Sequence, residues 1–143
     1  MTCTITADLM EAYYHCPRKA FLIMAGEPNP IPHEYVRITA EQAADNRQAH
    51  SNRLAGDITT FESLTDMAAG REILSDAELI TGDLYARYDF LMRTTEPSRR
   101  GSFVYEPVKV IGTYRASKAD ANGLAYQASF SVEYRGGFQQ LVR

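Results

Sequence analysis

The spacing of apolar and polar residues changes along the chain and predicts helices in its first half and strands in its second. Apolar residues recur at helical spacing after Thr6, a residue type that caps helix N-termini. Pro17 cannot lie inside that helix without breaking it, so the first helix should end near Tyr14 and the chain should turn at His15–Cys16. A second helix then begins with Pro17 in its first turn and stops at Gly26.

Two further segments complete the helical half. We expect the second helix to bury one side through three apolar residues: Phe21, Leu22 and Met24. Three prolines between Glu27 and Pro32 predict a loop. The stretch from His33 to Leu54 is rich in Ala, Gln, Glu and Arg, which favour helix, so a long polar helix ended by Gly56 is expected there.

The second half has the pattern of strands. Between Glu78 and Thr94, apolar and polar residues alternate most regularly from Tyr88 to Arg93, as they do in a half-buried strand. The remaining expected elements are a hairpin loop at Glu96–Gly101, a strand at Ser102–Tyr114, a helix at Ser117–Tyr134 and an edge strand at Phe138–Val142. The order of helices, two or three strands, helix and strand is typical of an α/β protein.

Composition indicates one soluble domain of ordinary size. The chain has 143 residues, of which 45% are apolar and 23% charged, close to globular averages. The longest apolar run, Ala20–Ala25, is too short to cross a bilayer, and Met1–Asp8 lacks the basic and apolar regions of a secretory signal. Two cysteines, Cys3 and Cys16, cannot build a disulfide framework or a paired-cysteine zinc site. We therefore expect a reduced, cytoplasmic protein with no membrane association, folded as a single domain over 1–143.

Charge is distributed unevenly between the two halves. Met1–Thr81 holds six basic and twelve acidic residues, a net charge of −6, whereas Gly82–Arg143 holds nine basic and six acidic residues, a net charge of +3. Two ordinary solvated faces would explain this difference, and so would a local surface for phosphates. The residues expected on such a surface are Arg93, Arg99, Arg100, Arg115 and Lys118.

Short catalytic and binding motifs are mostly missing. The chain has no GxGxxG, GxxxxGK[ST], HExxH or GxSxG, so dinucleotide, P-loop, zincin and hydrolase functions lack their main signals. The single RGG at 135–137 is explained more simply as the end of a helix. His15 and Cys16 are not spaced with other residues as a tetrahedral metal set requires.

Three runs of residues together resemble a known family. They are ITADL followed by YHCPRKAFL at 14–22, ARYDFL at 86–91 and YEPVK at 105–109. This combination resembles the RecB-like nucleases of the PD-(D/E)XK superfamily, in particular the CRISPR-associated exonuclease branch. The resemblance implies an α/β fold with a PD-(D/E)XK-like core: N-terminal helices, a central mixed sheet of three to four strands, a C-terminal helix and a short edge strand.

The resemblance also implies a site and its cofactor. In such nucleases two carboxylates on adjacent strands hold Mg²⁺ or Mn²⁺, which polarises the scissile phosphate and activates a water. Asp89 matches the first carboxylate, and His50 in the long helix matches a histidine that completes the coordination. Asn122 and Tyr126 stand where the family has Gln and Tyr, and Tyr126 is a further candidate DNA contact. Only Cys16 represents the family's four cluster cysteines, so no iron–sulfur cluster is expected.

The chain departs from the family at the second strand. Aligned on the proline, the family's acidic residue falls on Lys109 and its lysine on Ile111. Glu106 could replace the missing carboxylate, giving a catalytic set of Asp89, Glu106 and Lys109 and a metal set of His50, Asp89 and Glu106. Side chains alternate along a strand, however, so Glu106 and Lys109 face opposite sides unless a bulge at Pro107 re-aims them. A lysine beside Asp89 would also pair with it and oppose Mg²⁺.

Three hypotheses follow. The first is a DNA-binding domain of this fold with a degenerate or altered nuclease site, acting on a single strand or a duplex end, with a further protein partner in a nucleic-acid-processing complex. The second is a working Mg²⁺- or Mn²⁺-dependent DNA nuclease. The third is a structural or interaction protein that has kept the fold without DNA binding.

Overall fold

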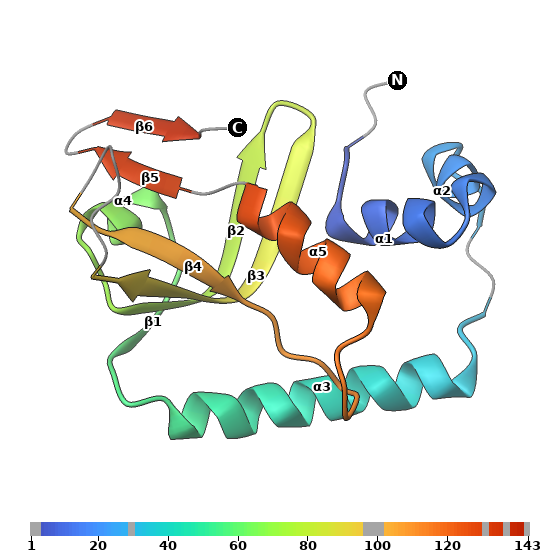
Figure 1. Ribbon diagram of the computed structural model, residues 1–143, viewed down its shortest axis with the longest axis horizontal. Coiled ribbons are helices and arrows are strands. Elements are labelled where there is room, and N and C mark those ends of the chain that lie inside the picture. The colour runs from blue at the N-terminus through green and yellow to red at the C-terminus, as the bar shows by residue number, and fades with distance from the viewer. Residues whose placement is uncertain (1–3, 29–30, 96–101, 130–131, 136–137, 142–143) are drawn as a thin grey trace.

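Five helices and six strands make up the fold of the computed structural model, which describes residues 4–28, 31–95, 102–129, 132–135 and 138–141 (Figure 1). In chain order the elements are α1 (Ala7–His15), α2 (Pro17–Met24), α3 (Glu34–Arg53), β1 (Ile58–Thr60), α4 (Leu64–Ala68), β2 (Ile73–Thr81), β3 (Leu84–Thr94), β4 (Val104–Val108), α5 (Lys118–Ser129), β5 (Val132–Arg135) and β6 (Phe138–Leu141).

The corner between α1 and α2 confirms the predicted helix boundaries. The Thr6 side chain accepts a hydrogen bond from the Leu9 amide at 3.1 Å, as an N-cap residue should. Cys16 has an extended backbone and lies between the two helices, and Pro17 occupies the first turn of α2. Gly26 follows α2 with a φ of +74°, a left-handed conformation that glycine adopts without cost.

The expectation that α2 buries one side is wrong. Of the residues of α2, only Ala20 is buried, whereas Phe21, Leu22 and Met24 are exposed. The reason is that α2 packs chiefly against α1, and it meets α1 through the small side chains Ala12 and Ala20.

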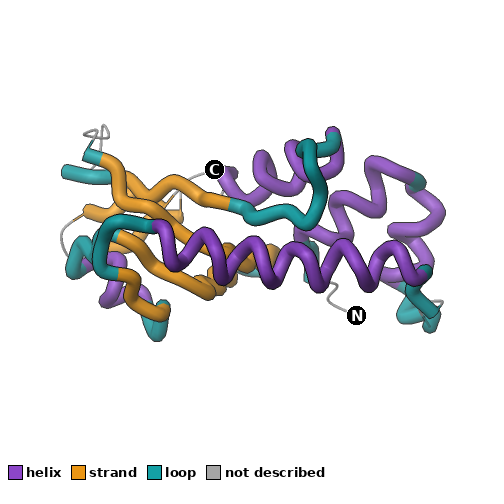
Figure 2. Tube along the Cα trace, turned by 90° about the horizontal axis from the view of Figure 1, so that it is seen from below, coloured by secondary structure: helices purple, strands orange, loops and turns teal. Residues whose placement is uncertain are grey.

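The long polar helix is confirmed as α3. His33 caps its N-terminus by accepting a hydrogen bond from the Tyr35 amide at 3.1 Å, and Leu54 ends it. No residue of α3 is buried. Figure 2 shows α3 as a long rod that lies along the strands at one end and along the other helices at the opposite end. It contacts the chain after β4, where the Asn46 side chain donates to the Ile111 carbonyl at 2.8 Å.

A mixed, open sheet confirms the α/β class. Strand β1 runs parallel to β2, while β3 runs antiparallel to both of its neighbours, β2 and β4. Strands β5 and β6 continue the sheet in the order β1-β2-β3-β4-β5-β6, with β5 joined to β4 through the pair Val104 and Glu133. The predicted central sheet of three to four strands therefore corresponds to β1–β4, and the predicted edge strand corresponds to β6.

One predicted strand is confirmed and the other is too long. Tyr88–Arg93 lies within β3, and the chain reverses before β3 at Gly82, which has a φ of +56°. Of the strand predicted at Ser102–Tyr114, only Val104–Val108 forms β4. Beyond it, the Val110 amide donates to the Asp89 carboxylate at 2.8 Å instead of to a neighbouring strand.

The C-terminal helix is also shorter than predicted. Residues Lys118–Ser129 form α5, and Val132–Tyr134, expected as the end of that helix, belong instead to β5 (Val132–Arg135). The β-branched and aromatic residue types of Val132 and Tyr134 suit a strand, and pairing with both β4 and β6 prevails over helix propensity. The hairpin loop predicted at Glu96–Gly101 lies outside the described residues.

The main core lies between the sheet, α4 and α5. It is built from eight buried residues: Met67, Leu74, Ala77, Leu79, Ala86, Tyr88, Leu91 and Tyr105. Tyr88 donates from its hydroxyl to the Gln127 carbonyl at 3.0 Å, and burial raises the pKa of that hydroxyl above its usual range. Among the described residues, no helix has the length and apolar character needed to span a membrane.

Candidate functional site

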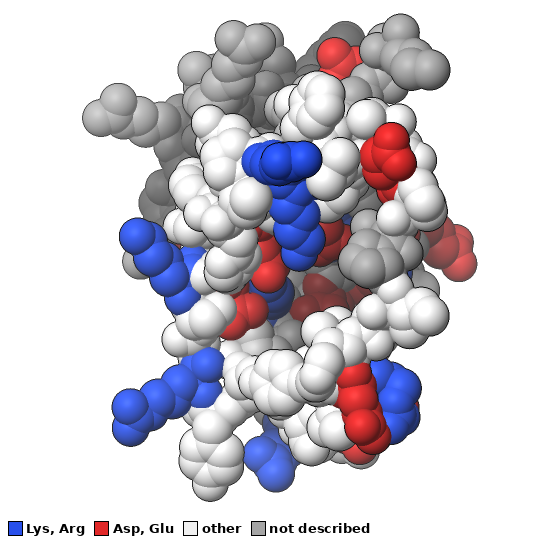
Figure 3. All heavy atoms as spheres, turned by 90° about the vertical axis from the view of Figure 1, so that its right-hand side faces the viewer, with Lys and Arg blue, Asp and Glu red and all other residues white. Residues whose placement is uncertain are grey.

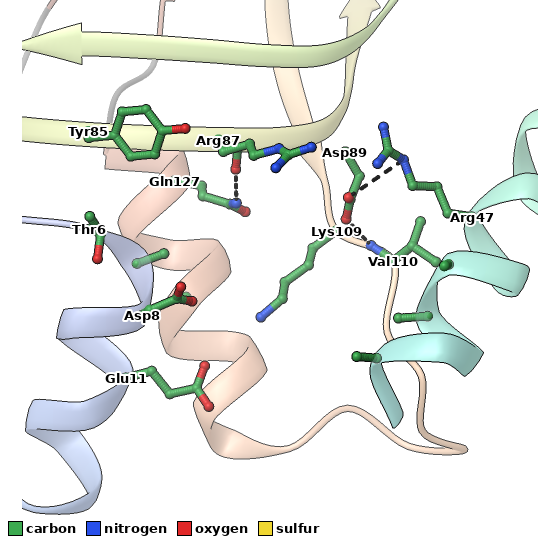
Figure 4. Close-up of a pocket in the computed structure, with 15 residues that line it drawn as sticks. Thr6, Asp8, Glu11, Arg47, Tyr85, Arg87, Asp89, Lys109, Val110 and Gln127 are labelled. Atoms are coloured by element: carbon green, nitrogen blue, oxygen red, sulfur yellow. Dashed lines mark hydrogen bonds and ion pairs between the residues drawn. The ribbon is translucent and has the colours of Figure 1, made fainter. Parts of the chain in front are cut away.

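A charged cavity of about 730 Å³ opens between α1, α3, α5 and strand β3. Its walls carry three cationic and three anionic side chains: Arg47, Arg87, Lys109, Asp8, Glu11 and Asp89 (Figure 4). Figure 3 shows the molecule hollowed between its upper and lower helices, with acidic and basic side chains gathered in the hollow. The charges are therefore concentrated inside a cleft.

Arg47 contacts two carboxylates that lie opposite each other on neighbouring strands. Asp76 lies on β2 between residues that pair with Phe90 and Tyr88, which places it opposite Asp89 of β3. The Arg47 guanidinium hydrogen-bonds Asp76 through Nη2, and its Nε lies 3.7 Å from Oδ1 of Asp89. The cation on α3 therefore offsets part of the negative charge of two carboxylates on neighbouring strands.

Asp76 carries two signs of a specialised position. Its φ of +56° is a left-handed conformation that few residues other than glycine adopt, although aspartate tolerates it better than most. The hydrogen bond from Arg47 lowers the pKa of Asp76, and a second guanidinium, that of Arg87, lies 3.4 Å from the same carboxylate oxygen. The carboxylate is thus held in its charged form.

Asp89 is bound on both of its carboxylate oxygens. Oδ2 accepts a hydrogen bond from the Val110 amide at 2.8 Å, while Oδ1 faces Arg47. Its two oxygens therefore serve to tie the chain after β4 and helix α3 to the sheet.

The expected pairing of Lys109 with Asp89 is wrong, because Lys109 pairs with Asp120 of α5. Its Nζ lies 3.3 Å from Oδ1 of Asp120. A Cβ at Gly123, one turn along α5, would lie 3.3 Å from the same Nζ, so glycine leaves room for the ammonium group. Burial acts to raise the pKa of Asp120, but hydrogen bonds from Ser117 and Lys109 outweigh it and leave the pKa below its usual value.

Glu106 does not join Asp89 and Lys109 in the cavity. It is exposed on β4, where it pairs with Met92. The pairing of Pro107 with Leu91 and of Val108 with Phe90 keeps the register continuous, so no bulge re-aims the side chains. The proposed catalytic set is therefore only partly assembled.

His50 lies apart from the cavity as well. It is on α3, three residues beyond Arg47, and its ring contacts the Phe90 ring with centroids 5.6 Å apart. Its Nε2 is buried and has no hydrogen-bond partner among the described residues. In the described part of the chain, no three His, Cys, Asp or Glu side chains come together as a metal ion would require.

The residues present do not fit a divalent cation. Asp89 and Asp76 already share the Arg47 guanidinium, Lys109 is paired with Asp120, and Glu106 lies elsewhere. A metal ion would need bare oxygen ligands, whereas these oxygens face fixed cations.

The residues expected to bind DNA are found in three kinds of position. Arg115 and Lys118 are exposed. Arg93 is exposed too, but its guanidinium is engaged by the protein itself: it donates to the Gly70 carbonyl at 2.5 Å and lies over the Phe103 ring. Tyr126 donates to the Ile5 and Tyr85 carbonyls at 2.7 and 3.1 Å. Arg99 and Arg100 lie outside the described residues.

Comparison of the chain with family models, with curated proteins and with solved structures gives no match. The cavity must therefore be interpreted from its own geometry.

Sequence reasoning did not identify seven residues that the structure places in or beside this site: Asp8, Glu11, Arg47, Asp76, Arg87, Asp120 and Gln127. Gln127 is 8% exposed; its amide nitrogen donates to the Arg87 carbonyl at 2.5 Å, and its Oε1 has no partner in the described part of the chain. One available signal was that Arg47 and His50, three residues apart, share a face of the long helix. The other contacts join distant parts of the sequence.

Proposed function

We propose that the protein is a DNA-binding domain with a PD-(D/E)XK-like core that does not cleave its ligand. The observation that carries the proposal is the Arg47 guanidinium between Asp76 and Asp89. A nuclease of that superfamily needs its carboxylates free to hold Mg²⁺ or Mn²⁺, and here a protein cation takes that role permanently. We therefore expect a charged cleft that binds DNA and does not carry out metal-dependent cleavage.

The arrangement of elements supports the same core. N-terminal helices precede a mixed sheet, and α5 follows strands β1–β4 in the chain. Asp89 lies on β3, which has β2 on one side and β4 on the other. Tyr126 on α5 holds the N-terminal segment against β3, which gives the expected tyrosine of that helix a packing role.

Three accessible cations supply the phosphate-binding surface in this proposal. Arg87 lines the cavity with 60% of its side chain exposed. Arg115 lies in the loop before α5, Lys118 is the first residue of α5, and both are exposed. They lie in the chain between Val110 and Gly123, two residues that line the cavity. Phosphate contacts from such residues bind nucleic acid with little sequence preference and strong salt dependence.

We expect salt-sensitive binding of DNA, weakened by loss of Arg115 and Lys118. Fluorescence anisotropy with a labelled single strand and a labelled duplex should show affinity falling linearly on a logarithmic salt scale. The double variant Arg115→Ala/Lys118→Ala removes two phosphate contacts and should flatten the slope by roughly 1.4 to 1.8.

Arg53→Ala is the matched control, because Arg53 is an exposed cation at the far end of α3. It should leave the slope unchanged. Absence of salt-sensitive binding at low salt would overturn the proposal. An equal change of slope in Arg53→Ala would show that Arg115 and Lys118 are not the phosphate-binding surface.

A further inference from the structure

Exposed apolar side chains are concentrated on α1, α2 and the beginning of α3. Thirteen large hydrophobic residues in the described part of the chain are exposed, and ten of them lie between residues 13 and 38. These ten form what we call the α2–α3 face: Tyr13, Tyr14, Phe21, Leu22, Ile23, Met24, Ile31, Tyr35, Val36 and Ile38. Figure 3 views the molecule from this side and shows mostly uncharged surface above and below the hollow.

The protein's own packing does not use this face. The second core cluster consists of only three buried residues, Leu9, Ala12 and Ala20, and α3 contributes no buried residue. Phe21 is 66% exposed and Ile31 is 95% exposed. The helices thus present their larger apolar side chains outward and hold together through their smaller ones.

Taken together, the ten side chains offer an area close to what one partner contributes to a standard interface. A buried aromatic side chain covers about 150–250 Å², so the four exposed rings offer roughly 450 Å². The six aliphatic side chains offer about as much area again. Burying such surface is favourable by roughly 25 cal/mol for each Å². The largest apolar patch of a typical monomer is about 300–600 Å², while a standard interface buries about 800 Å² per partner.

Charges beside the face are complementary to one another. Helix α2 carries Arg18 and Lys19 and no acidic residue. At the start of α3, Glu34 and Glu41 share the single guanidinium of Arg37, which leaves a net negative charge there. A basic apolar helix and an acidic apolar helix on one molecule are what a self-complementary interface requires.

We propose that the α2–α3 face binds a second copy of the chain in a twofold-symmetric dimer, with α2 of each copy against the beginning of α3 of the other. The abundance of aliphatic side chains and the negative charge of α3 favour a protein over a nucleic acid as the occupant. Dimer formation goes beyond DNA binding and does not depend on it.

Sedimentation equilibrium tests the dimer at protein concentrations from about 1 to 100 µM, which spans micromolar dissociation constants. The full chain should be dimeric at the upper end. Phe21→Asp should raise the dissociation constant by at least about tenfold, because it places a charge in the centre of an apolar interface. Tyr114→Asp, at an exposed aromatic residue outside the face, should leave it unchanged.

Charge reversal provides an independent test of the pairing. Lys19→Glu should weaken the dimer, and combining it with Glu41→Lys should restore it. If Phe21→Asp fails to fold, Ile31→Asp takes its place at a residue with almost no contacts. A monomer at every concentration, or a dimer indifferent to these variants, would overturn the proposal; so would a monomer whose affinity for single-stranded DNA falls with Phe21→Asp, which would assign the face to nucleic acid.

Discussion

Replacing Gly112 by alanine is expected to lower the free energy of unfolding by about 3 kcal/mol, the upper end of the usual range for overpacking. A Cβ at Gly112 would lie 1.9 Å from the Thr39 carbonyl oxygen and 2.9 Å from the Ala43 amide nitrogen. Both neighbours are backbone atoms of α3, so no side chain can rotate to make room. The helix must move away, and the hydrogen bond from Asn46 to Ile111 would be lost with it. Urea unfolding measures the change.

Gly26→Ala is the matched control for this effect. Gly26 has a left-handed backbone, but nothing lies within 4 Å of the added Cβ. Conformational strain alone should cost about 1 kcal/mol there. If Gly112→Ala is no less stable than Gly26→Ala, α3 does not pack on the chain after β4 as described.

Replacing Arg47 by methionine is expected to cost about 1 to 3 kcal/mol at neutral pH, the range for lost hydrogen bonds to charged groups. Methionine keeps much of the side-chain volume and its contact with Phe90. It leaves Asp76 and Asp89 facing each other without the guanidinium that separates them. Arg53→Met, at an exposed cation on the same helix, should have little effect.

The effect of Arg47→Met should depend on pH. The folded-state pKa of Asp76 is depressed, chiefly by the hydrogen bond from Arg47, so its contribution is present above the unfolded value of about 3.9. That contribution is lost as the pH falls through the folded pKa. The difference between wild type and variant should therefore be large at pH 7 and shrink toward pH 3. An equal difference at both pH values would show that Arg47 acts through packing alone.

The predictions that succeeded rest on local chemistry. Pro17, Thr6 and Gly26 act on their own backbone neighbours, and they correctly placed the corner between α1 and α2. The composition of His33–Leu54 was enough to predict α3 because a long run of helix-forming residues needs no partner to be recognised.

The predictions that failed depended on distant parts of the chain. Val110 and Ile111 continue the apolar run of the predicted strand, yet β4 ends at Val108 and the Val110 amide donates to Asp89 instead. The apolar residues of α2 have helical spacing, but spacing alone does not reveal whether a second layer covers them. Strand β1 and helix α4 are too short to leave a periodic signal.

The same reasoning explains what the sequence could say about the site. Asp89 could be identified because it lies in a regular strand with a recognisable neighbourhood. Arg47 could not, because its contact with Asp76 joins residues 29 positions apart and depends on how α3 crosses the sheet. Lys109 could be singled out because the chain departs there from the family that it resembles, but its partner Asp120 depends on how α5 lies beside the chain after β4.

The most direct measurement is a binding and cleavage assay on one sample, with labelled DNA, Mg²⁺ or Mn²⁺, and the full chain. The protein should retard the labelled DNA in a salt-sensitive complex, and digestion of the protein should then return the DNA at full length. Cleavage products that require the metal and disappear in Asp89→Ala would contradict a site closed by Arg47 and would establish a working nuclease.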